Sequence, residues 1–355
     1  MKKLLFFIVL SCVMFTLYAQ PGISTSIPSE KPSKYQKKQI KRKYGMFIHF
    51  GINTFHDVEW SDGSFPADSY VPTDVDARQW VKTAKDAGMK YIILVAKHHE
   101  GFCLWDSKYT DYDVAVSGNK TNVIEAVARE CKKQGMKLGL YYSLWDRKVN
   151  ADVKNMESDN GYNDYMLKQL NELMDITEKY TKIVEFWFDG SWVKPSYRWP
   201  IKEIYQTIKS REPQCQIGIN WTIGKDANPN DPDAPAKSYK INPEDQKEGD
   251  PIRYFPSDFR LGDPLLPANP DPKVFTHDGK RYYMPFESTV CLSKRWFYHT
   301  TDKEYKSMDE LVRLYQRATA QDNILILNLP PNREGKMRQE DVNLLIELRK
   351  HIRDL

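Results

Sequence analysis

Residues 76–99 read DARQWVKTAKDAGMKYIILVAKHH, and this stretch decides the fold class. Its first part has the apolar spacing of an amphipathic helix, Gly88 ends that helix, and an apolar run follows that ends in two histidines. The pattern returns in residues 122–146, NVIEAVARECKKQGMKLGLYYSLWD, with Gly135 lying 47 residues after Gly88. A helix followed by a continuous apolar strand, repeated in this way, predicts parallel β/α units.

Further helix and strand patterns extend the series to at least seven strands. The additional predicted helices are residues 162–180 and 201–213, and the additional predicted strands are residues 45–51, 183–190, 216–221, 286–292 and 323–330. No GxGxxG or GxxxxGK[ST] phosphate-binding loop supports an open nucleotide-binding sheet. We therefore expect an α/β fold, a (β/α)₈ TIM-like barrel, closed by a helix over residues 339–355. One face of that helix is predicted to hold Val342, Leu345, Ile346 and Ile352.

The domain organisation is predicted from the two ends of the barrel pattern. Residues 1–19 have two lysines, an apolar core and a small final residue, the layout of a signal peptide, and residues 20–39 form a lead-in. We expect one catalytic barrel over residues 40–355, exported to the periplasm or the extracellular space. Cys12 leaves a lipoprotein signal as an alternative, although the apolar run continues past it.

Charge and cysteine content argue against several function classes. The formal charge is +4, and it falls to +2 without Lys2 and Lys3. No basic stripe with interleaved aromatic residues is present, so nucleic acid is not an expected partner. Four cysteines follow the signal peptide singly, without metal-type spacing, and are interpreted as buried free thiols: Cys103, Cys131, Cys215 and Cys291.

Residues 226–285 interrupt the alternation of helices and strands. They hold 11 of the 21 prolines, together with many Asp and Asn residues, so little regular structure is expected there. The aromatic residues in the same region favour a loop that packs over the active-site face. A loop of this length inside a compact domain is usually functional or disordered.

Polar and aromatic residues gather where the predicted strands end. The active site of a barrel of this type lies at the C-terminal ends of its strands. These residues are therefore expected to share one pocket: His49, His98, His99, Tyr142, Ser143, Asp189, Asn220 and Trp221.

A metal-dependent hydrolase is the first alternative that these residues allow. His49, His98, His99 and Asp189 are all metal-ligand types. Adjacent residues of a strand, however, point to opposite faces, so His98 and His99 suit one shared metal poorly. Another interpretation places the histidines as hydrogen-bonded residues of the barrel rim. We expect no cofactor and no metal.

Carboxylates beside tryptophans favour carbohydrate chemistry. Asp189 lies two residues after Trp187 and thus on the same face of its strand, and Glu287 begins a later apolar stretch. A retaining glycosidase needs two carboxyl groups about 5 to 5.5 Å apart, one as nucleophile and one as acid/base. Asp189 is the candidate nucleophile. Glu287 is the candidate partner, with Glu59, Glu100 and Glu185 as competitors from composition and spacing alone.

Six co-linear motifs give a resemblance to a known family. The chain resembles the α-L-fucosidases of glycoside hydrolase family 29 in six motifs spread over about residues 40–355. These motifs are YGMFIHFGINTF, KHHEGFCLW, LGLYYSLWD, VEFWFDGSW, PFESTVCLSKRWFYH and NILILNLPPNREGKM. The branch acting on α-1,3- and α-1,4-linked fucose is the more similar one. The resemblance implies a retaining exo-glycosidase with a fucosylated oligosaccharide or glycoconjugate as substrate.

The same resemblance implies roles for individual residues. Asp189 falls on the family's nucleophile, and Glu287, nine residues before Trp296, falls on the acid/base glutamate of the branch. The implied substrate-binding residues are His49, Glu59, Trp60, His98, His99, Tyr142 and Trp187. Tyr141 is the alternative to Tyr142.

The sequence also departs from the family. Glu100 stands where the family more often has Asp. The segments EWSDGSF and MPFES replace the usual sequences around Glu59 and Glu287. No C-terminal β-sandwich is expected. A barrel that binds fucosylated glycans without cleaving them is the non-enzymatic alternative.

Overall fold

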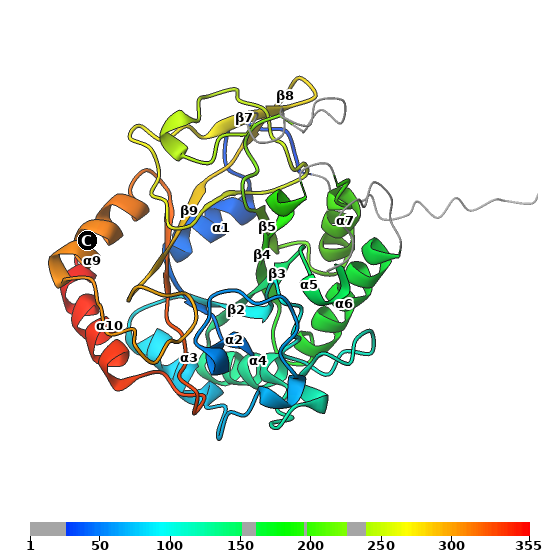
Figure 1. Ribbon diagram of the computed structural model, residues 1–355. Coiled ribbons are helices and arrows are strands. Elements are labelled where there is room, and N and C mark those ends of the chain that lie inside the picture. The colour runs from blue at the N-terminus through cyan, green and yellow to red at the C-terminus, as the bar shows by residue number, and fades with distance from the viewer. Residues whose placement is uncertain (1–25, 151–160, 195–196, 226–238) are drawn as a thin grey trace, which may run out of the picture.

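Eight parallel strands form the centre of the protein. The computed structural model describes residues 26–150, 161–194, 197–225 and 239–355. The strands follow one another in the order β5-β4-β3-β2-β1-β10-β9-β6, and a parallel bridge between Gly218 and Phe259 joins the two edges into a nearly closed barrel (Figure 1). Their bounds are β1 Tyr44–Ile48, β2 Tyr91–Lys97, β3 Lys137–Ser143, β4 Ile183–Asp189, β5 Gln216–Ile219, β6 Arg260–Gly262, β9 Phe286–Cys291 and β10 Ile324–Asn328. The expected (β/α)₈ architecture is confirmed.

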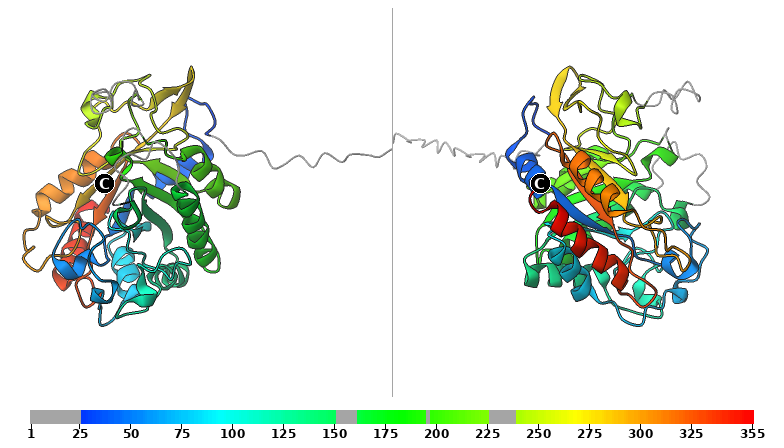
Figure 2. Two further views of the ribbon diagram at one scale, coloured as in Figure 1. Left: turned by 45° about the vertical axis from the view of Figure 1, so that its right-hand side comes forward. Right: turned by 90° about the vertical axis from the view of Figure 1, so that its left-hand side faces the viewer.

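Helices surround this barrel. Figures 1 and 2 show the strands inside and the long helices at the periphery. The longer helices are α1 Lys34–Arg42, α3 Ala77–Asp86, α4 Val123–Gln134, α6 Tyr162–Thr177, α7 Ile201–Arg211, α9 Met308–Thr319 and α10 Gln339–Ile352. The short ones are α2 Asn53–His56, α5 Arg147–Asn150 and the 3₁₀ turns Ala67–Ser69, Val114–Val116, Ser191–Val193 and Pro243–Asp245.

Helix α4 shows how local sequence sets these bounds. The Asn122 side chain accepts a hydrogen bond from the backbone N–H of Glu125 and thereby caps the first turn. Gly135 ends the helix in the left-handed conformation, with φ of 74°. Between these signals Val127 and Cys131 are buried against the sheet. The four predicted cysteines are free and buried, as expected.

Strands β1, β2, β3, β4 and β10 contribute side chains to two separate cores. In β2, Ile92 and Leu94 belong to the large cluster between the sheet and the helices, whereas Ile93 and Val95 belong to a smaller cluster with Phe47. This alternation places the second cluster inside the barrel. The strands are therefore buried on both faces, which explains why their sequences read as continuous apolar runs.

The expectation of little regular structure in residues 226–285 holds for most of the described part, residues 239–285, with three short strands as exceptions. This part supplies β6 and an antiparallel hairpin of β7 (Val274–His277) and β8 (Lys280–Tyr283). The hairpin stands at the edge of the molecule (Figure 2) and pairs with Ser29 through Tyr282. It does not cover the pocket at the C-terminal strand ends. Residues 226–238 lie outside the described part of the chain.

Helix α1 closes the N-terminal end of the barrel. Gln39 and Arg42 donate hydrogen bonds of 3.2 and 2.7 Å to Oε2 of Glu185, which is fully buried at the start of β4. The predicted lead-in, residues 20–39, thus contains part of a helix from residue 34 onward. The predicted signal peptide, residues 1–19, lies outside the described residues. In the described part of the chain, no helix has the length and apolar character needed to cross a membrane.

Helix α10 confirms the predicted closing helix with a shifted buried face. Leu345 and Ile352 are buried as expected, together with Leu348. Ile346, which we expected on the same face, is 36% exposed.

We predict that Gly218→Ala weakens the joint between β5 and β6. A Cβ atom at this position would lie 2.5 Å from the ring of Phe259. Because the ring fills the barrel interior, the clash should lower the free energy of unfolding by about 1–3 kcal/mol, measured by urea denaturation. Gly51→Ala is the matched control, since its Cβ would meet Phe297 at an ordinary 3.7 Å. Equal effects of the two substitutions would contradict the proposed closure.

Candidate active site

A polar pocket of about 360 Å³ lies at the C-terminal ends of the strands. Its lining combines aromatic rings with carboxyl, amide and imidazole groups from seven of the eight strands or the segments that directly follow them. The lining residues are Phe47, His49, Trp60, His98, His99, Tyr141, Trp187, Asp189, Trp192, Asn220, Trp221, Asp263 and Trp296. The predicted convergence of the strand ends is therefore observed.

Asp189, the last residue of β4, is held by three hydrogen-bond donors. The hydroxyl of Tyr141 donates to Oδ2 at 3.0 Å, and Trp192 Nε1 and Asn220 Nδ2 each donate to Oδ1 at 3.1 Å. Asp189 is thus held in a fixed orientation at the wall of the pocket.

The chain turns sharply directly after Asp189. Gly190 has φ of 78°, and a Cβ atom there would approach Cβ of Trp145 to 2.8 Å. Glycine is therefore required for Trp192 to fold back over the carboxylate. Trp221 is a non-glycine residue in the same left-handed region, with φ of 59°, and its ring lines the pocket. Strained backbone of this type often accompanies functional sites.

His49 and His99 are neutral acceptors facing the pocket. Burial, followed by the neighbouring His98, lowers the pKa of both rings well below the ordinary value. His49 Nδ1 lies 2.7 Å from Asn328 Oδ1, so Nδ1 donates, and Nε2 is left as an acceptor. His99 Nδ1 likewise donates to Ser143 Oγ at 2.7 Å, because that hydroxyl donates to the carbonyl of Trp145.

Glu100 lies next to His98. Its Oε2 lies 3.4 Å from His98 Nδ1 and accepts a 3.0 Å hydrogen bond from Asn53 Nδ2. Glu100 is 1% exposed and does not line the pocket. The departure from the family at this position therefore changes a residue behind the histidine pair, which the sequence alone did not reveal.

Glu59 and Trp60 have different positions relative to the pocket. Trp60 is 49% exposed and lines the mouth. Glu59 does not line it; its Oε2 accepts hydrogen bonds from the backbone N–H groups of Trp296 at 3.0 Å and Phe297 at 3.4 Å. Burial raises the pKa of Glu59. Glu59 thus positions Trp296, whose ring is part of the wall.

Tyr141, and not Tyr142, faces the pocket. Tyr142 points into the core between sheet and helices, where its hydroxyl donates to Gln169 Oε1 at 2.7 Å. The pairing of β3 with β4 decides which of the two tyrosines faces inward, because Tyr141 is the neighbour of the inward-facing Trp187. The assignment of Tyr142 to the site was wrong, and the alternative, Tyr141, is the lining residue.

Glu287 lies below the pocket and not in its wall. It is the second residue of β9 and pairs in register with Ile324, the first residue of β10, so it belongs to the N-terminal half of the barrel. Its oxygens accept hydrogen bonds from the Tyr91 hydroxyl at 2.9 Å and from Trp187 Nε1 at 3.1 Å. The expectation that Glu287 enters the pocket opposite Asp189 was therefore wrong.

Glu185 and Glu287 form a hydrogen-bonded carboxyl pair in this lower half. Burial and the neighbouring Glu185 raise the pKa of Glu287 well above its usual value, so Glu287 carries the shared proton. Burial also raises the pKa of Glu185, although Arg42 opposes that shift. Trp187 connects the two ends of the barrel, since its ring lines the pocket while its Nε1 reaches Glu287.

Asp263 is a pocket residue that the sequence analysis missed. It follows β6 directly, in the proline-rich region, and Asn220 Nδ2 donates to its Oδ1 at 3.4 Å. Burial, followed by the charge of Asp189, raises the pKa of Asp263 well above its usual value. The only sequence signal is an aspartate after a three-residue strand, Arg260–Gly262, which is too short to recognise by periodicity.

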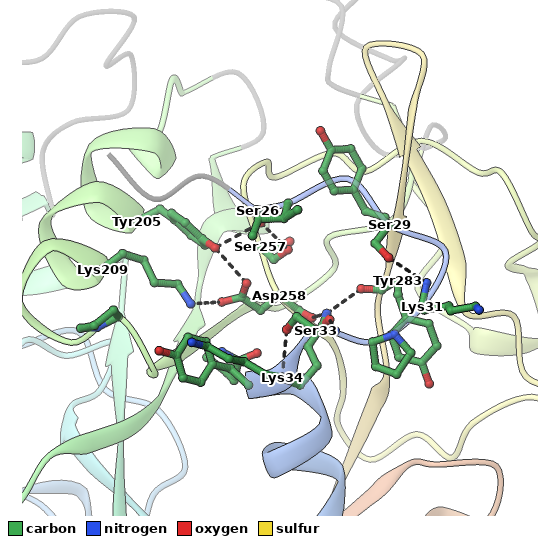
Figure 3. Close-up of a pocket in the computed structure, with 17 residues that line it drawn as sticks. Ser26, Ser29, Lys31, Ser33, Lys34, Tyr205, Lys209, Ser257, Asp258 and Tyr283 are labelled. Carbon is green, nitrogen blue, oxygen red and sulfur yellow. Dashed lines mark hydrogen bonds and ion pairs between the residues drawn. The ribbon is translucent and has the colours of Figure 1, made fainter. Parts of the chain in front are cut away.

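A second cavity, of about 430 Å³, lies at the opposite end of the barrel. Figure 3 shows its lining from the start of α1, the end of α7 and β8. Its buried charged residues are already paired: Lys209 Nζ lies 2.8 Å from Asp258 Oδ2, and the Tyr205 hydroxyl donates to Asp258 at 2.9 Å. The cavity is remote from Asp189, so the smaller polar pocket is the candidate active site.

Within residues 26–150, 161–194, 197–225 and 239–355, no group of three or more His, Cys, Asp or Glu side chains is arranged to hold a metal ion.

Comparison with known proteins identifies relatives of one kind. The sequence matches the family model described as Alpha-L-fucosidase over residues 56–354. It is 32% identical over 332 residues to Alpha-L-fucosidase 1 of Arabidopsis thaliana, a match covering 89% of this chain and 59% of that protein. The chain thus spans less than two thirds of that relative's length.

Solved structures give the same result. A Ruminococcus gnavus glycoside hydrolase family 29 fucosidase in complex with fucose superposes with a TM-score of 0.69 at 26% identity, covering 94% of this chain and 70% of that one. Alpha-L-fucosidase isoenzyme 1 from Paenibacillus thiaminolyticus gives a TM-score of 0.68 at 25% identity, covering 90% and 76%.

We predict that Glu287→Gln makes stability less sensitive to alkaline pH. The folded pKa of Glu287 is raised above the unfolded one, so the stability it contributes is complete below the unfolded pKa and is lost as pH rises toward the folded pKa. A glutamine does not titrate. Melting temperatures from pH 5 to 9 should therefore fall less for Glu287→Gln than for the wild type. Glu304→Gln, at an exposed position, is the control, and identical slopes for all three proteins would refute the buried pair.

Proposed function

This chain belongs to the α-L-fucosidase family, and we propose on that basis that it hydrolyses terminal α-L-fucosyl linkages of glycans. The match over residues 56–354 and the names of the relatives support this activity. The observation that carries it is the Asp189 carboxylate, held by three donors in an aromatic-walled pocket at the C-terminal face of the barrel.

The proposed mechanism is retaining, with Asp189 as the nucleophile. Its Oδ atom would attack the anomeric carbon of fucose and form a covalent glycosyl-enzyme, which water then hydrolyses. A nucleophile must be held in place, and the three hydrogen bonds to Asp189 fix the orientation of its carboxyl group. Gly190 supports the arrangement, because it allows the tight turn that brings Trp192 over the carboxylate.

The pocket chemistry supports a single terminal sugar as the bound group. A volume of about 360 Å³ is at the small end of ligand pockets. The neutral Nε2 atom of His49 offers an acceptor for a sugar hydroxyl, and Trp187 and Trp296 offer faces for the C–H groups of the sugar. Nε2 of His99 lies 3.5 Å from Asp189 Oδ2. These features support the proposed exo-acting specificity for fucosylated oligosaccharides or glycoconjugates.

Preference for α-1,3 and α-1,4 linkages is the finer part of the proposal. It rests on the motif resemblance, particularly the segment from Glu287 to Trp296. Fucose release from oligosaccharides with α-1,2, α-1,3, α-1,4 and α-1,6 linkages tests it directly. Release mainly from the α-1,3 and α-1,4 compounds supports the preference, and release mainly from the others refutes it while leaving the activity in place.

Export is proposed from sequence alone. The charged start, apolar core and Ala19 of residues 1–19 favour cleavage by a signal peptidase and a periplasmic or extracellular enzyme. N-terminal sequencing of the secreted protein tests this proposal.

We predict that Asp189→Ala lowers the turnover of aryl α-L-fucosides by on the order of 10³-fold or more, because the covalent step loses its nucleophile. Added azide should restore product formation and yield β-L-fucosyl azide, since azide then attacks the substrate directly. Product analysis by NMR checks both points. Wild-type turnover in Asp189→Ala would contradict the assigned nucleophile.

A pair of tyrosine variants tests which residue contacts Asp189. Tyr141→Phe removes a hydrogen bond to the carboxylate and should lower kcat/KM by about 10- to 100-fold, as expected for a hydrogen bond to a charged group. Tyr142→Phe should leave kcat/KM within about threefold and instead lower the free energy of unfolding by about 1–3 kcal/mol, because Gln169 loses its donor. The reverse pattern would contradict the observation that Tyr141 faces the pocket and Tyr142 faces the helices.

A further inference from the structure

The proposed reaction needs a second carboxyl group that reaches the glycosidic oxygen. Glu287 is fully buried below Trp187 and does not line the pocket. Glu59 also lies outside the lining, with one oxygen occupied by backbone N–H groups. In the described part of the chain, only Asp189 and Asp263 contribute carboxyl groups to the pocket wall.

Asn220 brings these two carboxyl groups close together. Its Nδ2 lies 3.1 Å from Asp189 Oδ1 and 3.4 Å from Asp263 Oδ1, so the two oxygens are separated by no more than the sum, 6.5 Å. Carboxyl groups of retaining glycosidases are about 5–5.5 Å apart, and those of inverting enzymes about 6.5–9.5 Å. The upper limit of 6.5 Å between the two oxygens is therefore compatible with the carboxyl separation of a retaining glycosidase.

The surroundings of the two groups divide the roles between them. Asp189 accepts three hydrogen bonds from other side chains, whereas Asp263 accepts one long contact from another side chain, that of Asn220. The pocket wall formed by the described residues contains no lysine or arginine that would hold Asp263 in its charged form. Burial and the Asp189 charge raise the pKa of Asp263, and a group that protonates a leaving oxygen must start in this neutral state.

We propose that Asp263 is the general acid/base of the glycosidase reaction, acting opposite Asp189 from the end of β6. This inference rests on the proposed function, and it replaces Glu287 in that role. Asn220 is then a positioning residue that holds both carboxyl groups through one amide nitrogen.

The reaction proceeds in two steps. In the first, Asp189 forms a bond to the anomeric carbon, the bond to the glycosidic oxygen breaks, and that oxygen takes the proton of Asp263, releasing an alcohol. In the second, the Asp263 carboxylate takes a proton from water, the water oxygen bonds to the anomeric carbon, and the ester bond to Asp189 breaks. Fucose leaves with retained configuration, and both carboxyl groups return to their initial states.

Leaving-group dependence tests the role of Asp263. Asp263→Asn should lower kcat/KM by about 10²- to 10⁴-fold on fucosides with a poor leaving group, such as methyl fucoside or a fucosylated oligosaccharide. The loss should be far smaller on a 2,4-dinitrophenyl fucoside, whose leaving group needs no protonation. The alkaline limb of the wild-type pH profile should also disappear, because it reports the ionisation of the acid. An equal loss on all substrates, with that limb retained, would overturn the proposal.

Azide separates the acid/base from the nucleophile in a readout that needs only residual activity. In Asp263→Ala, azide should attack the fucosyl-enzyme in place of water and give α-L-fucosyl azide, the retained anomer. The inverted β anomer is expected from Asp189→Ala. A β product or no azide product from Asp263→Ala, with folding checked by its melting temperature, would overturn the assignment.

Glu287→Gln provides the rival comparison. If Asp263 is the acid, Glu287→Gln keeps the leaving-group dependence and the alkaline limb of the wild type, whatever its absolute rate. If Glu287→Gln shows the pattern predicted for Asp263→Asn, the proposal fails and the fucosidase activity stands. A wild-type protein that releases no fucose from any aryl fucoside refutes the proposed function itself.

Discussion

Closure of eight parallel strands is the constraint on which the rest of the molecule depends. Parallel strands place all their C-terminal ends at one mouth, and closure through Gly218 and Phe259 turns that edge into a ring. Side chains from β4, β5 and β6 then meet across a few ångströms although they are distant in the sequence. The contact of Asn220 with both Asp189 and Asp263 exists because β5 and β6 are joined at this seam.

The barrel keeps two acidic centres apart. Asp189 and Asp263 lie at the C-terminal mouth of the barrel, whereas Glu185 and Glu287 lie in its N-terminal half, next to α1. Trp187 stands between them, with its ring in the upper centre and its Nε1 bound to the lower one. The lower pair is closed off from the pocket and has the hydrogen-bond partners of a structural group, while the upper pair faces the space where a substrate would bind.

Strand periodicity predicted the parts of this site that depend on a single strand. Asp189 and Trp187 lie on one face because they are two residues apart, and His49, His98 and His99 follow long apolar runs. The errors concern relations between strands. The choice between Tyr141 and Tyr142 depends on the register of β3 with β4, and the depth of Glu287 depends on where β9 begins. The sequence specifies neither quantity locally. Asp263 was missed because β6 has three residues, too few to show a period.

Covalent trapping tests the central claim, that Asp189 attacks the sugar in this pocket, most directly. The protein would be incubated with 2-deoxy-2-fluoro-α-L-fucosyl fluoride, whose glycosyl-enzyme hydrolyses slowly, and the labelled peptide identified by mass spectrometry. The account predicts one fluorofucosyl group per chain, attached to Asp189 in the segment from Ile183 to Gly190. A label on a different residue, or turnover of natural substrates with inverted configuration, would contradict it.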